Sequence, residues 1–164
     1  MTQRLLRAAC VTLFLWGCGT PAKTFVIYHT SDIHGGISAR EAWWHKANPK
    51  RRDGGFAALC ALLKKEKLPY LLLDSVDIFQ GTPEGNLTQG TAVITAMNAL
   101  AYDAVTIGNH EYDYGEDNLA RLEKMAQFPM LAGNIFKWRT KQLVPYATPT
   151  KMVTVAGVKV GLIG

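Results

Sequence analysis

Three short apolar runs, each followed by acidic residues or a histidine, constrain the fold of this chain more than any other feature. The runs cover residues 25–28, 70–73 and 104–107, and their β-branched and leucine-rich composition is typical of strands buried on both faces. Helical patterns separate them at 56–67 and 91–101. The alternation predicts a parallel sheet whose polar residues lie beyond the carboxyl ends of the strands, where such sheets bind ligands.

The rest of the chain continues this pattern. A further helix is predicted over 116–127 and a fourth strand over 130–135, and two alternating runs within 151–163 predict a hairpin. Residues 37–53 are polar and irregular, which predicts an excursion loop. We therefore expect an α/β fold with a mainly parallel sheet and helices on both of its faces. Because the chain stops at Gly164, directly after a buried run, we expect the domain to be truncated at a strand.

The N-terminal residues 1–22 have the pattern of an export leader. Arg4 and Arg7 precede an apolar core over 8–16 that is too short for a comfortable membrane span. The sequence that follows the core resembles a bacterial lipobox, Leu15-Trp16-Gly17-Cys18. We expect an exported protein of the periplasm or cell envelope, anchored to the membrane by a lipid on Cys18. Secretion without a lipid and an uncleaved anchor are the alternatives.

Charge and cysteine usage exclude several classes of protein. The net charge is +5, and two of these charges belong to the leader. The other basic residues form short runs, such as 50–52, without a long stripe interleaved with aromatics, so a nucleic-acid polymer is not an expected partner. Beyond the leader the chain has one cysteine, Cys60, so neither a zinc-thiolate site nor a redox motif is supported.

The residues after the three runs suggest a metal site. Asp32 and His34 are two positions apart, and in an extended segment such residues point the same way, so both can bind one cation. The carboxylate of Asp77 can bridge two ions, and the carbonyl oxygen of Asn109 is a neutral ligand for the second. This mixed nitrogen and oxygen set suits Mn, Zn, Fe, Co or Mg. Each residue alone is more often a loop or cap residue, so the prediction depends on their combination at three strand ends.

Two divalent ions in one site polarise a phosphoryl group and activate water near neutral pH. His110 would face the phosphate, and Asp113 could hold the imidazole tautomer and favour its protonated form. A protonated histidine there can stabilise charge in the transition state or donate a proton to the leaving oxygen.

Four motifs together resemble the calcineurin-like metallophosphoesterases: His29-Thr30-Ser31-Asp32-Ile33-His34-Gly35-Gly36, Asp74-Ser75-Val76-Asp77, Gly81-Thr82-Pro83, and Gly108-Asn109-His110-Glu111-Tyr112-Asp113-Tyr114-Gly115. Residues 97–105 are similar to the bacterial 5'-nucleotidase and UDP-sugar hydrolase branch. The resemblance implies an αββα sandwich that holds two metals. It also implies that Asp32 and His34 bind the first metal, that Asp77 bridges the two metals and that Asn109 binds the second. His110 and Asp113 would form the catalytic dyad.

The chain departs from the family pattern in two places. Val76 stands where the family has Gly before the bridging aspartate, and a β-branched residue is badly suited to a backbone with positive φ. The family's later metal-binding histidines and its separate substrate domain follow further along, and this chain has no histidine after His110. Residues 23–164 are therefore interpreted as the N-terminal part of the metallophosphoesterase domain.

The expected function of the complete enzyme is hydrolysis of nucleotide phosphate monoesters in the manner of a 5'-nucleotidase, with little or no activity in these 164 residues alone. One alternative is a truncated or degenerate pseudoenzyme that acts only as a membrane-tethered binding module. The other keeps the catalytic core but changes the substrate to cyclic nucleotides or another ester. Nanomolar metal affinity and robust turnover by this chain alone would contradict the expectation of inactivity.

Overall fold

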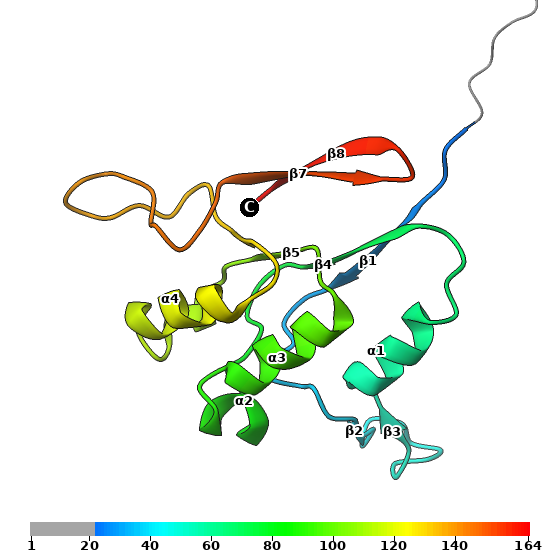
Figure 1. Ribbon diagram of the computed structural model, residues 1–164. Coiled ribbons are helices and arrows are strands. Elements are labelled where there is room, and N and C mark those ends of the chain that lie inside the picture. The colour runs from blue at the N-terminus through cyan, green and yellow to red at the C-terminus, as the bar shows by residue number, and fades with distance from the viewer. Residues whose placement is uncertain (1–21) are drawn as a thin grey trace, which may run out of the picture.

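A four-stranded parallel sheet organises the computed structural model, which describes residues 22–164 (Figure 1). The strands lie in the order β1-β4-β5-β6 and every neighbouring pair is parallel. Their bounds are Val26–Thr30 for β1, Tyr70–Asp74 for β4, Ala104–Thr106 for β5 and Met130–Leu131 for β6. The predicted α/β fold with a mainly parallel sheet is confirmed.

The helices of the described residues lie on one face of this sheet (Figure 1). They are α1 (Phe56–Leu63), α2 (Pro83–Leu87), α3 (Thr91–Leu100) and α4 (Glu116–Met125). Sequence reasoning placed helices on both faces. Each strand is added on the same side of the previous one, and right-handed crossovers that all progress in one direction put every connecting helix on the same face.

Two hairpins complete the described chain. Strands β7 (Thr150–Val155) and β8 (Val158–Ile163) form the predicted antiparallel hairpin, which lies over the face of the sheet that carries no helices (Figure 1). The segment expected as an excursion loop contains a second antiparallel pair, β2 (Arg40–Glu41) and β3 (Arg52–Asp53).

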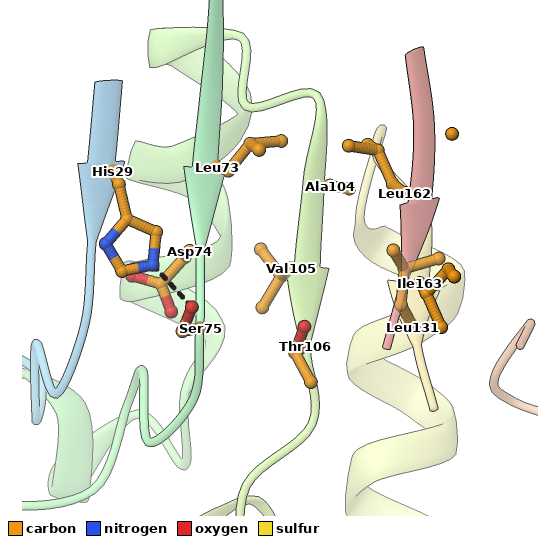
Figure 2. Close-up of a pocket in the computed structure, with 11 residues that line it drawn as sticks. His29, Leu73, Asp74, Ser75, Ala104, Val105, Thr106, Leu131, Leu162 and Ile163 are labelled. Atoms are coloured by element: carbon orange, nitrogen blue, oxygen red, sulfur yellow. Dashed lines mark hydrogen bonds between the residues drawn. The ribbon is translucent and has the colours of Figure 1, made fainter. Parts of the chain in front are cut away.

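A cavity of about 220 Å³ separates β8 from the sheet. Figure 2 shows His29, Leu73 and Asp74 on the sheet side of this cavity and Leu162 and Ile163 on the hairpin side. The Nε2 atom of His29 shares a hydrogen bond with the hydroxyl of Ser75 there. His29 therefore belongs to the cavity wall.

The main core lies between the sheet and its helices, and it also fixes the loop after β4. Leu72 of β4, Met97 of α3 and Leu122 of α4 are completely buried. Ile78 and Phe79, which follow β4 without regular secondary structure, are buried just as completely. Because these two side chains are held in the core, the preceding loop is held at a defined position beyond the strand.

In residues 22–164 no helix is both long enough and apolar enough to span a bilayer. The predicted leader, including Cys18, lies outside the described residues except for Ala22.

Candidate metal centre

The loop after β1 carries the first two predicted ligands in a left-handed backbone. Asp32 has φ 52° and His34 has φ 48°, a region that non-glycine residues seldom occupy. Sequence reasoning assumed that the Asp32–His34 segment is extended, and these φ values show that it is not. The backbone N–H of Asp32 donates to the carbonyl of Val76 (3.1 Å), and that of His34 donates to the carbonyl of Asp77 (2.9 Å). These bonds join the loops that follow two neighbouring strands.

The loop after β4 presents Asp77 through an equally unusual backbone. Val76 has φ 144° and Asp77 has φ 55°, so both lie in the left-handed region. A β-branched residue, which is badly suited to a positive φ, therefore occupies position 76. Positions held in such conformations cost of order 1–3 kcal/mol each and cluster at ligand sites. Asp77 is 8% exposed, so its carboxylate is presented from a nearly buried position.

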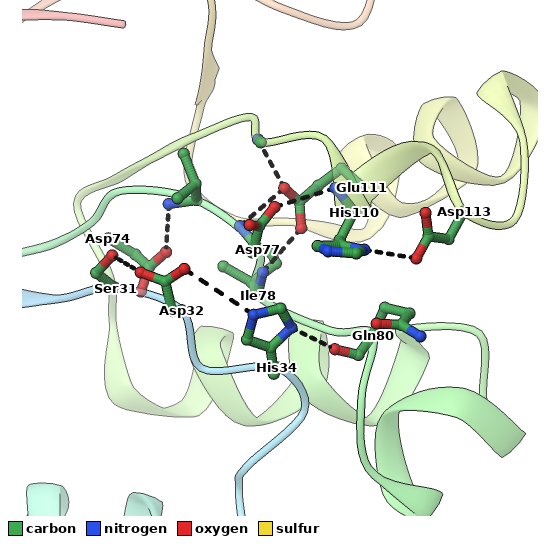
Figure 3. Close-up of polar contacts among 12 residues, drawn as sticks. Ser31, Asp32, His34, Asp74, Asp77, Ile78, Gln80, His110, Glu111 and Asp113 are labelled. Carbon is green, nitrogen blue, oxygen red and sulfur yellow. Dashed lines mark hydrogen bonds and ion pairs between the residues drawn. The ribbon is translucent and has the colours of Figure 1, made fainter.

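The side chains of Asp32, His34 and Asp77 converge. Each offers one ligand atom, and these atoms lie within 4.8 Å of one another. The Nδ1 atom of His34 is 2.8 Å from the carbonyl oxygen of Gln80, which can only accept a hydrogen bond, so Nδ1 carries the proton. The Nε2 atom is left with its lone pair and lies 3.9 Å from Oδ1 of Asp32 (Figure 3). Fixing the tautomer through the other ring nitrogen is the usual arrangement of a metal-binding histidine.

The loop after β5 brings the third strand end to the same place. The backbone N–H of His110, in the short helix η1 (His110–Tyr112), donates to Oδ1 of Asp77 (3.0 Å). The His110 ring lies against the His34 ring, with 5.2 Å between the two centroids. Asn109 precedes His110 on this loop and is exposed. The structure therefore brings together the three strand ends that the sequence singled out.

Gly108 permits this close approach. A Cβ atom at position 108 would lie 2.3 Å from Oδ1 of Asp77 and 2.7 Å from Cβ of Val76. Both distances are shorter than side chains tolerate, so a side chain at this position would push the loop after β5 away from the loop after β4.

His110 is paired with Asp113 as predicted. Its Nδ1 atom lies 2.8 Å from Oδ2 of Asp113 (Figure 3). This hydrogen bond is the main reason that the pKa of His110 is raised above its usual value, and the negative charges of Asp113 and Asp77 add to the effect. With Nδ1 bonded to the carboxylate, Nε2 is the ring nitrogen free to act on a substrate.

Glu111 is the residue that sequence reasoning missed. Its side chain is fully buried, and its carboxylate accepts backbone N–H bonds from Asp77 (3.0 Å), Ile78 (2.8 Å) and Gly108 (2.7 Å). Burial raises the pKa of this carboxyl group, and the three N–H donors oppose that rise. Figure 3 shows Glu111 between the loops that follow β4 and β5. An acidic residue directly after the candidate catalytic histidine was the available signal.

Asp74 supports the same region from the end of β4. It is nearly fully buried, and its carboxylate accepts bonds from the Thr30 hydroxyl (2.5 Å) and the Val76 N–H (3.1 Å). Burial raises the pKa of Asp74 to about 6. The side chain thus joins the end of β1 to the start of the loop that carries Asp77.

The residues present fit a divalent cation. Two carboxylates and an imidazole with a free Nε2 form a mixed oxygen and nitrogen donor set of the kind that binds divalent transition metals. The strained backbone at all three positions is consistent with a ligand-binding role, because such strain is retained where the surrounding structure enforces it.

Comparison with known proteins agrees with this fold. The profile of the calcineurin-like phosphoesterase family matches residues 25–158, and the chain belongs to this family. It is 34% identical to a 5'-nucleotidase of Bos taurus over 97% of this chain and 29% of that protein. It is 33% identical to a 5'-nucleotidase of Homo sapiens over 100% of this chain and 30% of that protein.

Solved structures show the same relationship. A 5'-nucleotidase precursor from Thermus thermophilus superposes with a TM-score of 0.73 and 34% identity, over 84% of this chain and 27% of that one. The sulfate thiohydrolase SoxB from Thermus shares the fold, with a TM-score of 0.73 at 15% identity, over 88% of this chain and 35% of that one. The chain thus spans about 30% of the length of the curated 5'-nucleotidases just described.

Proposed function

We propose that the protein to which these residues belong hydrolyses phosphate monoesters of nucleotides, as a metal-dependent phosphoesterase of the 5'-nucleotidase type. The observation that carries the proposal is the convergence of Asp32, His34 and Asp77 within 4.8 Å, with the His110–Asp113 pair directly beside them. The similarity to 5'-nucleotidases at 33–34% identity supports nucleotides as the substrate class.

In this proposal the chain contributes ligands to two divalent ions. Asp32 and His34 would hold the first ion, Asp77 would contribute to both ions, and Asn109 would offer its amide oxygen to the second. Asp77 is suited to the shared position because its backbone is fixed by Glu111 and its Oδ1 already accepts the His110 N–H. Bound divalent ions would polarise the phosphoryl oxygens and lower the pKa of water toward neutrality.

The His110 imidazole acts on the phosphate from beside the ligands. Because the Nδ1 proton is directed to Asp113, Nε2 faces the substrate. The raised pKa favours the protonated ring, so Nε2–H can donate to a phosphoryl oxygen that gains charge or to the departing ribose oxygen. Asp113 holds the ring in this orientation and stabilises its positive charge.

The experiment is hydrolysis of AMP, UDP-glucose and a cyclic nucleotide by the full-length protein with Mn²⁺, measured as phosphate from AMP and as the nucleoside monophosphate from the other two. We expect turnover of AMP, and we expect His110→Ala to lower kcat by about 10²–10⁴-fold, which is the usual contribution of general acid catalysis. Asp113→Asn should lower kcat less. A full-length protein that binds Mn²⁺ but hydrolyses none of these esters, or a His110→Ala variant with unchanged kcat, contradicts the proposal. Residues 1–164 assayed alone are expected to show little or no turnover.

We also propose that the protein is exported and attached to the membrane by a lipid on Cys18. The support is the leader pattern of residues 1–22 and the small residue Gly17 before the cysteine. Incorporation of labelled palmitate in a bacterial host, lost in Cys18→Ser, is the expected result. Equal labelling of the two proteins contradicts the lipid anchor.

A further inference from the structure

A second exposed feature lies outside the candidate metal centre. The basic hairpin, residues 134–143, follows β6 and projects beyond α4 (Figure 1). The N–H of Val144 donates to the Ile135 carbonyl (3.2 Å), and the N–H of Lys137 donates to the Gln142 carbonyl (2.8 Å). A turn at the tip is closed by the N–H of Lys141 on the Lys137 carbonyl (2.8 Å). The segment is therefore an ordered hairpin in which several backbone N–H and C=O groups are hydrogen-bonded to each other.

The base of this hairpin is fixed to the body of the domain. Val144 and Tyr146, which follow it, are both buried. The hydroxyl of Tyr146 is 3.1 Å from that of Tyr112, in the short helix that begins at His110. The tip is thus presented on a rigid support, connected through Tyr112 to the loop that carries the candidate catalytic histidine.

The tip exposes large aromatic side chains to solvent. Trp138 is 83% exposed and Phe136 is 51% exposed, and Leu143 pairs with Phe136 across the hairpin. The Lys141 ammonium lies 3.8 Å from the centre of the Trp138 ring. Within residues 22–164 these rings pack on no core, although rings of this size are the groups that gain most from leaving water.

The charge around these rings has one sign. The hairpin carries Lys137, Arg139 and Lys141 and contains no acidic residue. The surrounding sequence has the same bias, since residues 124–164 contain six basic residues and no Asp or Glu. A negatively charged surface would therefore meet no repelling carboxylate from this part of the chain.

We propose that the basic hairpin docks this protein on an anionic lipid bilayer. Tryptophan and phenylalanine rings settle at the level of lipid headgroups, and adjacent lysine and arginine side chains are attracted to anionic lipid. A hairpin with paired backbone groups can enter this interface at little cost in lost hydrogen bonds. The docking needs no membrane-spanning segment, and it would hold the metal centre at a set distance from the membrane. It is independent of the nucleotidase proposal.

The β2–β3 hairpin provides a matched comparison within the same chain. It also exposes two tryptophans, Trp43 (79%) and Trp44 (56%). Arg51 pairs with Asp53 at 2.6 Å and Arg52 donates to the Ala39 carbonyl at 2.6 Å, whereas Lys46 and Lys50 are exposed. This hairpin also carries Glu41 and Asp53, and such carboxylates repel an anionic surface, so its tryptophans should contribute less to binding than those of the basic hairpin.

The test is cosedimentation of the 164-residue chain with vesicles of phosphatidylcholine alone or with roughly 30% phosphatidylglycerol, which supplies the anionic surface. We expect binding to the anionic vesicles that weakens as salt rises from about 0.1 M to about 1 M, because the Debye length falls from about 10 Å to about 3 Å. The charge variant K137Q/R139Q/K141Q should bind roughly a hundredfold more weakly, at about fivefold per cation. The aromatic variant F136S/W138S should lose about tenfold.

Two controls separate docking from misfolding and from the shared N-terminus. W43S/W44S should bind the anionic vesicles like the parent, and K137R/K141R, which keeps the charge, should also retain binding. All variants carry the same residues 1–21, so differences among them report the hairpin. Equal binding to neutral and anionic vesicles, or parental binding by the charge and aromatic variants, overturns the proposal. Retention on heparin or DNA without vesicle binding also overturns it, because the surface would then bind polyanions.

Discussion

Replacing Glu111 with Gln tests how the metal centre is held together. The buried carboxylate accepts three N–H bonds, from Asp77 and Gly108 at one oxygen and from Ile78 at the other. A glutamine that keeps its oxygen toward Asp77 and Gly108 turns its NH₂ group against the Ile78 N–H. One hydrogen bond to a charged group is lost and two donors face each other, which costs about 2–3 kcal/mol. Alanine leaves all three donors unsatisfied and should cost about 4–5 kcal/mol.

Both changes should weaken metal binding beyond their effect on folding. Asp77 receives its backbone restraint from Glu111, and loss of such supporting contacts typically costs 10–100-fold in metal affinity. Urea unfolding of the chain and Mn²⁺ titration measure the two effects. Glu41→Gln, at an exposed position in β2, is the matched control and should change neither. A Glu111→Gln variant within about 0.5 kcal/mol of the parent, with unchanged Mn²⁺ affinity, would refute the reasoning.

Three further substitutions probe the same loops. Val76→Gly removes a β-branched residue from φ 144° and should raise the unfolding free energy by about 1 kcal/mol. A clear decrease in the unfolding free energy would contradict the inference that the backbone at Val76 is strained. Gly108→Ala places a Cβ 2.3 Å from Oδ1 of Asp77 and should lower Mn²⁺ affinity by about tenfold or more. Asp74 has a folded-state pKa of about 6, above its unfolded value of about 3.9, so its contribution to stability is present at low pH and lost as pH rises through about 4 to 6. In a chelating buffer the parent should lose about 2–3 kcal/mol more over that window than Asp74→Asn does, and identical pH profiles would rule out this origin.

The sheet and the meeting of its strand ends could be predicted because they follow from hydrophobic patterning. Buried strands such as Tyr70–Asp74 have a continuous apolar signature, and parallel strands must end on one edge. Patterning alone put helices on both faces, because the helix side depends on strand order, which patterning does not contain, whereas the resemblance implied an αββα sandwich with the helices of a sheet on one face.

The loops were predicted less well, for reasons of backbone conformation. Gly, Asn, Thr and Pro between 75 and 90 indicate a loop, yet Thr82 caps α2 within it by accepting the Gly85 N–H. The left-handed φ of Asp32 and His34 has no local sequence signal, because neighbouring loops enforce it. The hydrogen bonds that Glu111 accepts from Asp77 and Ile78 could not be predicted for the same reason, since these partners lie 34 and 33 positions away.

The central claim is that the loops after β1 and β4 hold a divalent metal through Asp32, His34 and Asp77. Mn²⁺ titration of the 164-residue chain, followed by electron paramagnetic resonance, tests it most directly, with His45→Ala as the control for a histidine outside the cluster. We expect saturable binding, weaker than nanomolar, that is retained in His45→Ala and abolished in His34→Ala and in Asp77→Asn. Equal binding by the parent, His34→Ala and Asp77→Asn would contradict it.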